Sequence, residues 1–273
     1  MKNILKLYGK DFLAAQEEKL KKGHDKLAYI LTAPNPGAQI YLQEFEKYLE
    51  FGEEHNALDP QIQGRLKKSY ESFFQARNEL MGGYFFSTRM GFKISYKPEG
   101  RNKKIGEFLI KTNNYEQIFV EMKSPIREAP GQVWSGLNFS TVKESIKYAV
   151  EKLKPNCKNL IVFSGQMEIA ISEPVLMISA LYGETFLSVN LKTQELKEGF
   201  APSGIFQPKI NTRISAVAAL AVSINADNEL FYSFQVYHNP YARNPISHEL
   251  FNDWPQFIKK ENIMEWINRP HSF

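Results

Sequence analysis

The chain has 273 residues and a mass of 31.5 kDa, with 43% hydrophobic, 23% charged and 13% aromatic residues. These proportions exclude a wholly disordered chain and supply enough apolar side chains for a sizeable core. The formal charge of +4 argues against an acidic tail or a highly cationic coat protein, and it is compatible with a nucleic-acid partner.

A single cysteine, Cys157, excludes an internal disulfide and any zinc site built from several cysteines. The longest apolar stretch, residues 214–224, is well short of the ~20 residues that a membrane helix needs. Lys6 and Lys10 interrupt the start of the chain before a signal-peptide core can form. We therefore expect a cytoplasmic protein that does not contact a membrane.

The first eighty residues have helical patterns. Residues 12–22 are good helix formers, and apolar side chains recur at helical spacing in residues 40–52. Asp59-Pro60 has the composition of a helix start, which predicts a helix over residues 61–81 that ends at Gly82-Gly83. Residues 1–80 are thus predicted to form a helical region packed on a core that comprises residues 81–273.

From Tyr84 onward the pattern becomes that of strands. Residues 91–96, 105–111 and 117–123 are predicted strands, and the short polar turns between them indicate an antiparallel meander. A helix is expected over residues 142–153, with Ser140 or Thr141 as its cap. The near-continuous apolar run 159–163 is typical of a buried parallel strand that follows a crossover helix.

The last third of the chain is less regular. Residues 174–182 fit either a helix or a buried strand, whereas residues 185–191, 214–224 and 229–237 favour strands. The whole pattern predicts an α/β fold with a mixed central sheet flanked by helices and a helical N-terminal part.

Charged side chains gather at the end of the third predicted strand of the meander. Glu121 and Lys123 are two residues apart and therefore share one face of the strand. Glu107, on the preceding strand, could converge with Glu121 if the two strands form a hairpin. Two carboxylates and the main-chain carbonyl of Met122 form a hard-oxygen site suited to Mg²⁺ or Mn²⁺. Such an ion polarises a phosphoryl oxygen and activates water, and Lys123 could orient that water.

The stretch G-E-F-L-I-K…F-V-E-M-K-S-P, which begins at Gly106, resembles the motif of the PD-(D/E)XK nuclease superfamily. In the resemblance Glu107 takes the place of the first acid, and Glu121 and Lys123 take the (D/E)-X-K places. Glu79 fits the place of the glutamate that is common on the preceding helix. The chain departs from the family pattern at two positions, with Gly106 for the usual proline and Glu107 for the usual aspartate.

The resemblance implies a restriction-endonuclease-like fold and a Mg²⁺-dependent endonuclease acting on DNA, in restriction or antiviral defence. It also implies that Glu107, Glu121 and the Met122 carbonyl hold the metal, that Glu79 supports this ion or a second one, and that Lys123 positions the water. The products would be a 5′-phosphate and a 3′-hydroxyl. A homodimer is expected because cleavage of both strands needs two active sites.

Two lysines on the predicted crossover helix, Lys143 and Lys147, share a helix face and could contact the phosphate backbone, although a solvated helix face explains them equally well. Residues 89–158 carry 14 Lys or Arg against 7 Asp or Glu, so the basic charge coincides with the predicted site. The main alternative is a catalytically silent nucleic-acid-binding or scaffold module with the same fold, which the departures at Gly106 and Glu107 motivate. RNA as the substrate is a further alternative.

Overall fold

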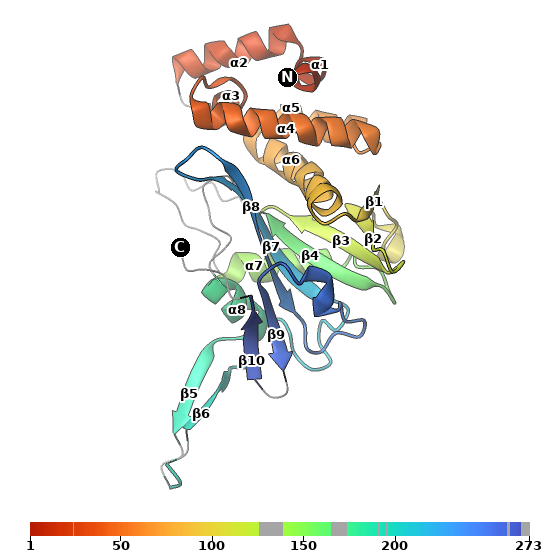
Figure 1. Cartoon of the computed structure of the whole chain (residues 1–273), viewed down its shortest axis with the longest axis vertical. Helices are drawn as coiled ribbons and strands as arrows, with labels where there is room; N and C mark the ends of the chain where they lie inside the picture. Colours follow the sequence, from red (N-terminus) through yellow and green to blue (C-terminus); the bar gives the residue numbers. More distant parts are fainter. Residues whose placement is uncertain are drawn as a thin grey trace. The chain divides into compact units, whose positions relative to one another are not determined.

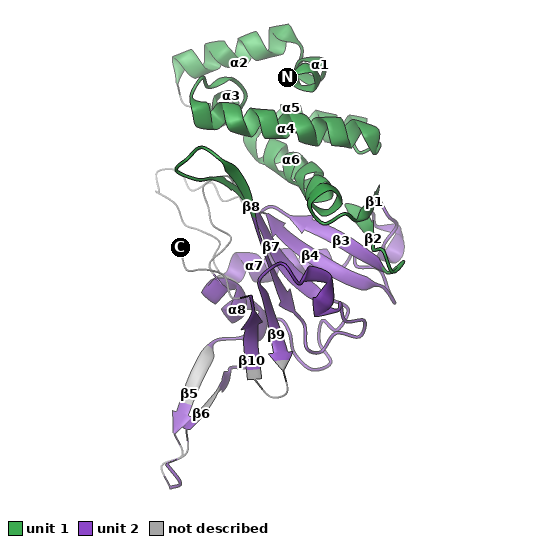
Figure 2. Cartoon of the chain, in the orientation of Figure 1, with its two compact units in different colours: residues 1–97, 107–116, 222–232 green, residues 98–106, 117–221, 233–273 purple. Residues whose placement is uncertain are grey.

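The computed structural model describes residues 1–23, 25–125, 139–164, 174–189, 192–194, 196–260 and 263–268. The chain divides into two compact units (Figure 2). Unit 1 comprises residues 1–97, 107–116 and 222–232, and unit 2 comprises residues 98–106, 117–221 and 233–273.

Unit 1 contains the helices that the N-terminal sequence predicts (Figure 1). They are α1 Lys2–Tyr8, α2 Lys10–Lys22, α3 Lys26–Thr32, α4 Pro36–Glu54, α5 Pro60–Lys68 and α6 Tyr70–Tyr84. Polar caps set the starts of four of them, because the side chains of Asp25, Asn35, Asp59 and Ser69 each accept a hydrogen bond from a main-chain N–H of the first turn. Apolar faces then pack around buried aromatic side chains such as Tyr48 and Phe73.

The helix predicted over residues 61–81 is wrong in two respects. Ser69 adopts an extended conformation with φ −150° and ψ 166°, so α5 ends before it and α6 begins after it. Gly82-Gly83 does not end α6, which runs to Tyr84 and continues as a π-helical turn, Phe85–Arg89. The reason is packing, since a Cβ on Gly83 would lie 1.9 Å from the hydroxyl oxygen of Tyr96.

The central sheet is mixed and has eight strands in the order β1-β2-β3-β4-β7-β8-β9-β10. β1 is antiparallel to β2, whereas β4 is parallel to both β3 and β7 and β9 is parallel to β8. The predicted α/β class with a mixed sheet flanked by helices is confirmed. The strands are β1 Lys93–Tyr96, β2 Phe108–Lys111, β3 Gln117–Lys123, β4 Lys158–Ser164, β7 Ala216–Ile224, β8 Leu230–His238, β9 Gln256–Lys260 and β10 Ile263–Ile267.

Two helices of unit 2 accompany this sheet. α7 Phe139–Val150 lies between β3 and β4 in the chain and packs against β3, as expected of a crossover helix. It begins and ends three residues before its predicted bounds, and the turn in which the Lys152 N–H donates to the Ala149 carbonyl follows its last residue. α8 Pro174–Tyr182 decides between the two alternatives for that segment in favour of a helix.

The remaining elements are short. β5 Thr185–Val189 and β6 Leu196–Phe200 form a separate two-stranded antiparallel sheet, and 3₁₀ turns occupy Arg101–Lys103 and His248–Phe251. The strands β6, β9 and β10, each of which has five residues, were not predicted from the sequence. Among the residues described here, no helix is both long enough and apolar enough to cross a membrane.

Candidate active site

β3 carries the two charged side chains of the (D/E)-X-K motif. Its residues 118–122 are buried, and its parallel register pairs Glu121 with Ile161 of β4 and Lys123 with Phe163. Because side chains alternate along a strand, Glu121 and Lys123 share one face. A strand with both faces covered is typical of a parallel sheet, so the position of Glu121 in the strand places its carboxylate in a buried environment.

Two lysines contact the carboxylate of Glu121, which has an exposed fraction of 0%. Glu121 Oε1 accepts a hydrogen bond from Lys123 Nζ at 2.6 Å, and the Nζ of Lys152 lies 2.7 Å from the same oxygen. The lysine side chains are only 20% and 30% exposed, so water screens these charge-assisted contacts less than it would at an open surface. The structure thus brings two cations to one carboxylate oxygen.

Lys152 is a contact of Glu121 that the sequence pattern does not predict. This residue lies in the turn after α7, in the run Glu151-Lys152-Leu153-Lys154, where nothing in the local pattern distinguishes one lysine from the other. The topology could have identified Lys152, because the chain returns to the sheet directly after the crossover helix, where this residue lies. A basic residue in that turn is therefore a candidate partner for an acid on β3.

A divalent cation at Glu121 would need oxygen ligands in addition to this carboxylate. A buried carboxylate needs a cation or hydrogen-bond donors to offset the loss of water, and Mg²⁺ or Mn²⁺ prefers oxygen ligands such as this carboxylate and the carbonyl of Met122. In the part of the chain that the structure describes, no group of three or more Asp, Glu, His or Cys side chains could hold a metal ion. An ion bound here would therefore need main-chain and water oxygens to complete its shell.

Glu107, the predicted first acid, belongs to unit 1, whereas Glu121 belongs to unit 2. Glu107 is half-buried directly before β2, and its main-chain oxygen accepts a hydrogen bond from the Lys97 N–H at 2.9 Å. At Gly106 a Cβ would lie 2.2 Å from the ring of Phe119, and the Gly106 N–H donates to the Pro98 carbonyl. Packing and this hydrogen bond explain why proline does not occupy that place.

Glu79 lies on α6 and forms a two-pronged ion pair with Arg65 of α5. The guanidinium nitrogens donate to the two carboxylate oxygens at 2.8 Å and 3.0 Å, and the side chains are 17% and 26% exposed. This geometry is the strong planar pairing of arginine with a carboxylate, and it joins two helices of unit 1. The supporting metal role of Glu79 stays a prediction, and its side chain has this structural partner.

The two lysines of the crossover helix have different surroundings. Lys143 is half-buried, its Nζ donates to the carbonyl of Ser203, and burial lowers the pKa of its ammonium below the usual value. Lys147 is exposed one turn further along α7. Of the two, Lys147 is the side chain that can reach an external phosphate without first breaking an internal contact.

A scan against models of protein families found no match, and searches of curated proteins and of solved structures found no similar protein.

Proposed function

We propose that this chain is a metal-dependent endonuclease of the PD-(D/E)XK type that hydrolyses phosphodiester bonds of DNA. The observation that carries the proposal is the contact between the carboxylate of Glu121 and the ammonium of Lys123 on a buried strand. The chain order α6, β1, β2, β3, α7, β4, with a β1–β2 antiparallel pair and a β3–β4 parallel pair, supports a restriction-endonuclease-like core.

The chain's own residues have distinct tasks in the proposed reaction. A divalent ion, when bound, would supply a Lewis acid for a water and for a phosphoryl oxygen. Glu121 and the Met122 carbonyl are the proposed ligands on β3, and the motif assigns Glu107 as the second carboxylate. Lys123 is partly exposed, so its ammonium can donate a hydrogen bond to the attacking water and hold it in line with phosphorus.

Lys152 makes that task possible for Lys123. A buried carboxylate with a single cationic partner would lose most of its compensation if that partner turned away. Because Lys152 contacts the same oxygen at 2.7 Å, Glu121 keeps one cation when Lys123 turns toward the water. The resemblance implies that attack on phosphorus leaves a 5′-phosphate and a 3′-hydroxyl.

The biological setting is part of the same proposal. Cleavage of both strands of a duplex needs two active sites, which favours a homodimer. The motif is typical of nucleases in restriction and antiviral defence. RNA is the alternative substrate of the same site.

A catalytically silent nucleic-acid-binding module is the second candidate function. The contact of two ammonium groups with one oxygen of Glu121 favours it, because a divalent ion must displace at least one of them. A silent module would retain the basic surface and lose cleavage.

A plasmid-nicking assay with Mg²⁺ tests the proposed activity. We compare the wild type with Lys123→Ala and Glu121→Gln, and we expect each variant to cleave about 10²–10³-fold more slowly, the range for loss of one group that stabilises the transition state. Lys259→Ala and Glu184→Gln are the matched controls, because each removes an exposed lysine or glutamate of unit 2. Both controls should cleave at the wild-type rate.

The outcomes separate the candidates. No cleavage by any purified preparation of the wild type, together with tight DNA binding, would favour the silent module. Equal cleavage by the wild type, Lys123→Ala and Glu121→Gln would refute the assignment of these residues. Degradation of single-stranded RNA in preference to plasmid DNA would change the substrate and keep the site.

A further inference from the structure

Two loops of unit 2 that are distant in sequence are joined by main-chain hydrogen bonds. One precedes β7 and the other follows β8. The N–H of Asn239 donates to the carbonyl of Ser215 at 3.0 Å, and the N–H of Arg243 donates to that of Thr212 at 2.7 Å. The side chain of Asn239, which is 3% exposed, adds a bond to the carbonyl of Ile214 at 2.9 Å. The backbones on either side of Arg213 and Arg243 are thus held together.

A buried asparagine on β4 holds the loop that precedes β7. Asn159 is 1% exposed, and its amide nitrogen donates to the carbonyls of Arg213 and Lys154, each at 3.0 Å. Its main-chain N–H donates to the hydroxyl of Ser215 at 2.9 Å, and that hydroxyl donates in turn to the carbonyl of Asn244. Buried, satisfied polar groups of this kind make a loop rigid.

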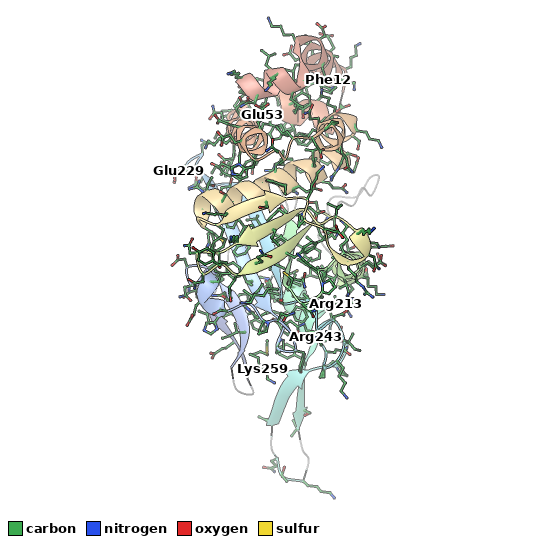
Figure 3. All side chains as sticks on the ribbon, turned by 90° about the vertical axis from the view of Figure 1, so that its right-hand side faces the viewer. Phe12, Glu53, Arg213, Glu229, Arg243 and Lys259 are labelled. Carbon is green, nitrogen blue, oxygen red and sulfur yellow. The ribbon has the colours of Figure 1, made fainter. Side chains whose placement is uncertain are left out.

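This scaffold holds like charges close to one another. Arg213 and Arg243 lie next to each other at the surface of unit 2 (Figure 3). Burial, followed by the nearby guanidinium groups of Arg101 and Arg243, lowers the pKa of Arg213 below its ordinary value. Across the residues that the structure describes, no carboxylate forms an ion pair with any of these three arginines. Because the scaffold is rigid, the like charges stay close together, and an anion would relieve their mutual repulsion.

The backbone of Arg101 links the cluster to the candidate active site. The N–H of Arg101 donates to the main-chain carbonyl of Lys152 at 3.0 Å, and the side chain of Lys152 contacts Glu121. Strand register gives the scale, because Glu121 aligns with Ile161 and Val217 across two parallel pairs. At about 4.8 Å per strand Val217 lies about 10 Å from Glu121, and Arg213 lies in the turn that precedes β7.

We propose that Arg101, Arg213 and Arg243 form a phosphate-binding site that holds the sugar–phosphate backbone of a nucleic acid beside the Glu121–Lys123 centre. The inference rests on the proposed nuclease function for the identity of its ligand. Guanidinium groups fit this ligand because each presents a planar fork of donors to two phosphate oxygens. The site reads no base, so it provides affinity and register rather than sequence specificity.

Binding without catalysis tests this site. The full chain is titrated into a fluorescent duplex DNA in the presence of EDTA, and anisotropy is measured over a series of salt concentrations. We expect Arg213→Gln/Arg243→Gln to bind about 10–100-fold more weakly at low salt. The slope of log K against log salt should fall by about 1.8, which is about 0.9 for each lost phosphate contact. Lys259→Gln, an exposed cation on β9 that Figure 3 labels apart from the two arginines, should keep the wild-type affinity and slope.

Two further measurements separate binding from folding. Arg213→Lys keeps the charge and should recover part of the affinity but not all of it, because an ammonium lacks the fork geometry. Thermal unfolding of the double Gln variant should occur at or above the wild-type midpoint, since the change removes repulsion and no ion pair. A lower midpoint would assign the arginines to folding and overturn the inference.

The remaining outcomes distinguish this inference from the proposed function. Wild-type affinity and slope in the double Gln variant would overturn the phosphate site even if the enzyme cleaves DNA. Weakened binding by that variant, with no cleavage by the wild type, would support the phosphate site and refute the proposed activity. A wild type that binds poly-glutamate and no duplex would overturn the site, because the partner would then be an acidic polypeptide.

Discussion

Buried and half-buried charged side chains have different sets of partners in unit 1 and in unit 2. In unit 1 each oxygen of Glu44 has one donor, with the hydroxyl of Tyr232 at 2.6 Å and the ammonium of Lys47 at 2.7 Å. The two oxygens of Glu79 likewise each have one nitrogen of Arg65. In unit 2 one oxygen of Glu121 has two ammonium groups, and the arginine cluster has no described carboxylate partner.

The difference indicates where charge stabilises the fold and where it is available to a ligand. A carboxylate with one donor on each oxygen is satisfied, so removal of a donor costs stability and nothing else. Where two cations contact one carboxylate oxygen, removal of either one leaves the other in place, so one of them can engage a ligand. Single substitutions of these partners in unit 1 should therefore change unfolding, whereas replacement of one lysine at Glu121 or of the clustered arginines should change binding more than unfolding.

The largest expected effect is a loss of stability at alkaline pH that affects unit 1 first. Burial raises the pKa of six tyrosine hydroxyls above the ordinary value of 10.0, so they stay protonated in the folded chain while the unfolded chain ionises. Stability is then fully present below about pH 10 and falls above it, by about 1.4 kcal/mol per pH unit for each tyrosine. Four of them belong to unit 1 (Tyr8, Tyr48, Tyr96, Tyr232) and two to unit 2 (Tyr182, Tyr237).

Two optical signals can follow this loss separately. Far-ultraviolet circular dichroism reports mainly on unit 1, which contains the helices α1 to α6. Tryptophan fluorescence reports on unit 2, because none of the three tryptophans lies in unit 1. The helical signal should therefore fall at a lower pH than the tryptophan fluorescence changes. Tyr232→Phe should reduce the alkaline pH dependence of the free energy of unfolding by about 1.4 kcal/mol per pH unit. At neutral pH the same variant should lose about 1.5–3 kcal/mol of stability, because Glu44 loses a hydrogen-bond donor. Tyr115→Phe, at an exposed tyrosine, should do neither.

The second effect is a non-additive pair in unit 2. Lys123→Met or Lys152→Met alone should lower the free energy of unfolding by less than about 1 kcal/mol, because the other lysine still contacts Glu121. The double variant leaves a buried carboxylate without either cation and should cost about 3–5 kcal/mol. Urea unfolding of the four proteins completes a double-mutant cycle, and additive losses would contradict the surplus of cations at Glu121.

The sequence predicted the elements that local pattern controls. The bounds of β3 match the predicted strand, since alternation and the following Ser124-Pro125 depend on neighbouring residues alone. Asp59 caps a helix with Pro60 in its first turn, as local cap chemistry requires. The parallel β3–β4 pair followed from the same reasoning, because an apolar run after a crossover helix has few other places in an α/β fold.

The errors and omissions arose where distant residues decide the structure. Gly82-Gly83 resembles a helix stop, yet the close approach of Tyr96 uses Gly83 as a packing position inside α6. The partner of Glu79, Arg65, is fourteen residues away, and the second lysine on Glu121 comes from another element. No periodicity records such contacts, so the residues of the motif were predictable but their ion-pair partners were not.

The smallest effect sharpens the comparison at Glu79, for which the proposed motif suggests a metal and the structure shows an ion pair with Arg65. Glu79→Gln and Arg65→Met should each lower the free energy of unfolding by about 1–2 kcal/mol, because the pair is partly buried and charge-assisted. The double variant should lose little more than either single one, since the two changes remove one interaction. Cleavage of plasmid DNA by Glu79→Gln should stay at the wild-type rate. A drop of about 10-fold or more, the usual cost of losing a supporting group around a metal, would show that Glu79 serves the metal and that unit 1 also carries functional charge.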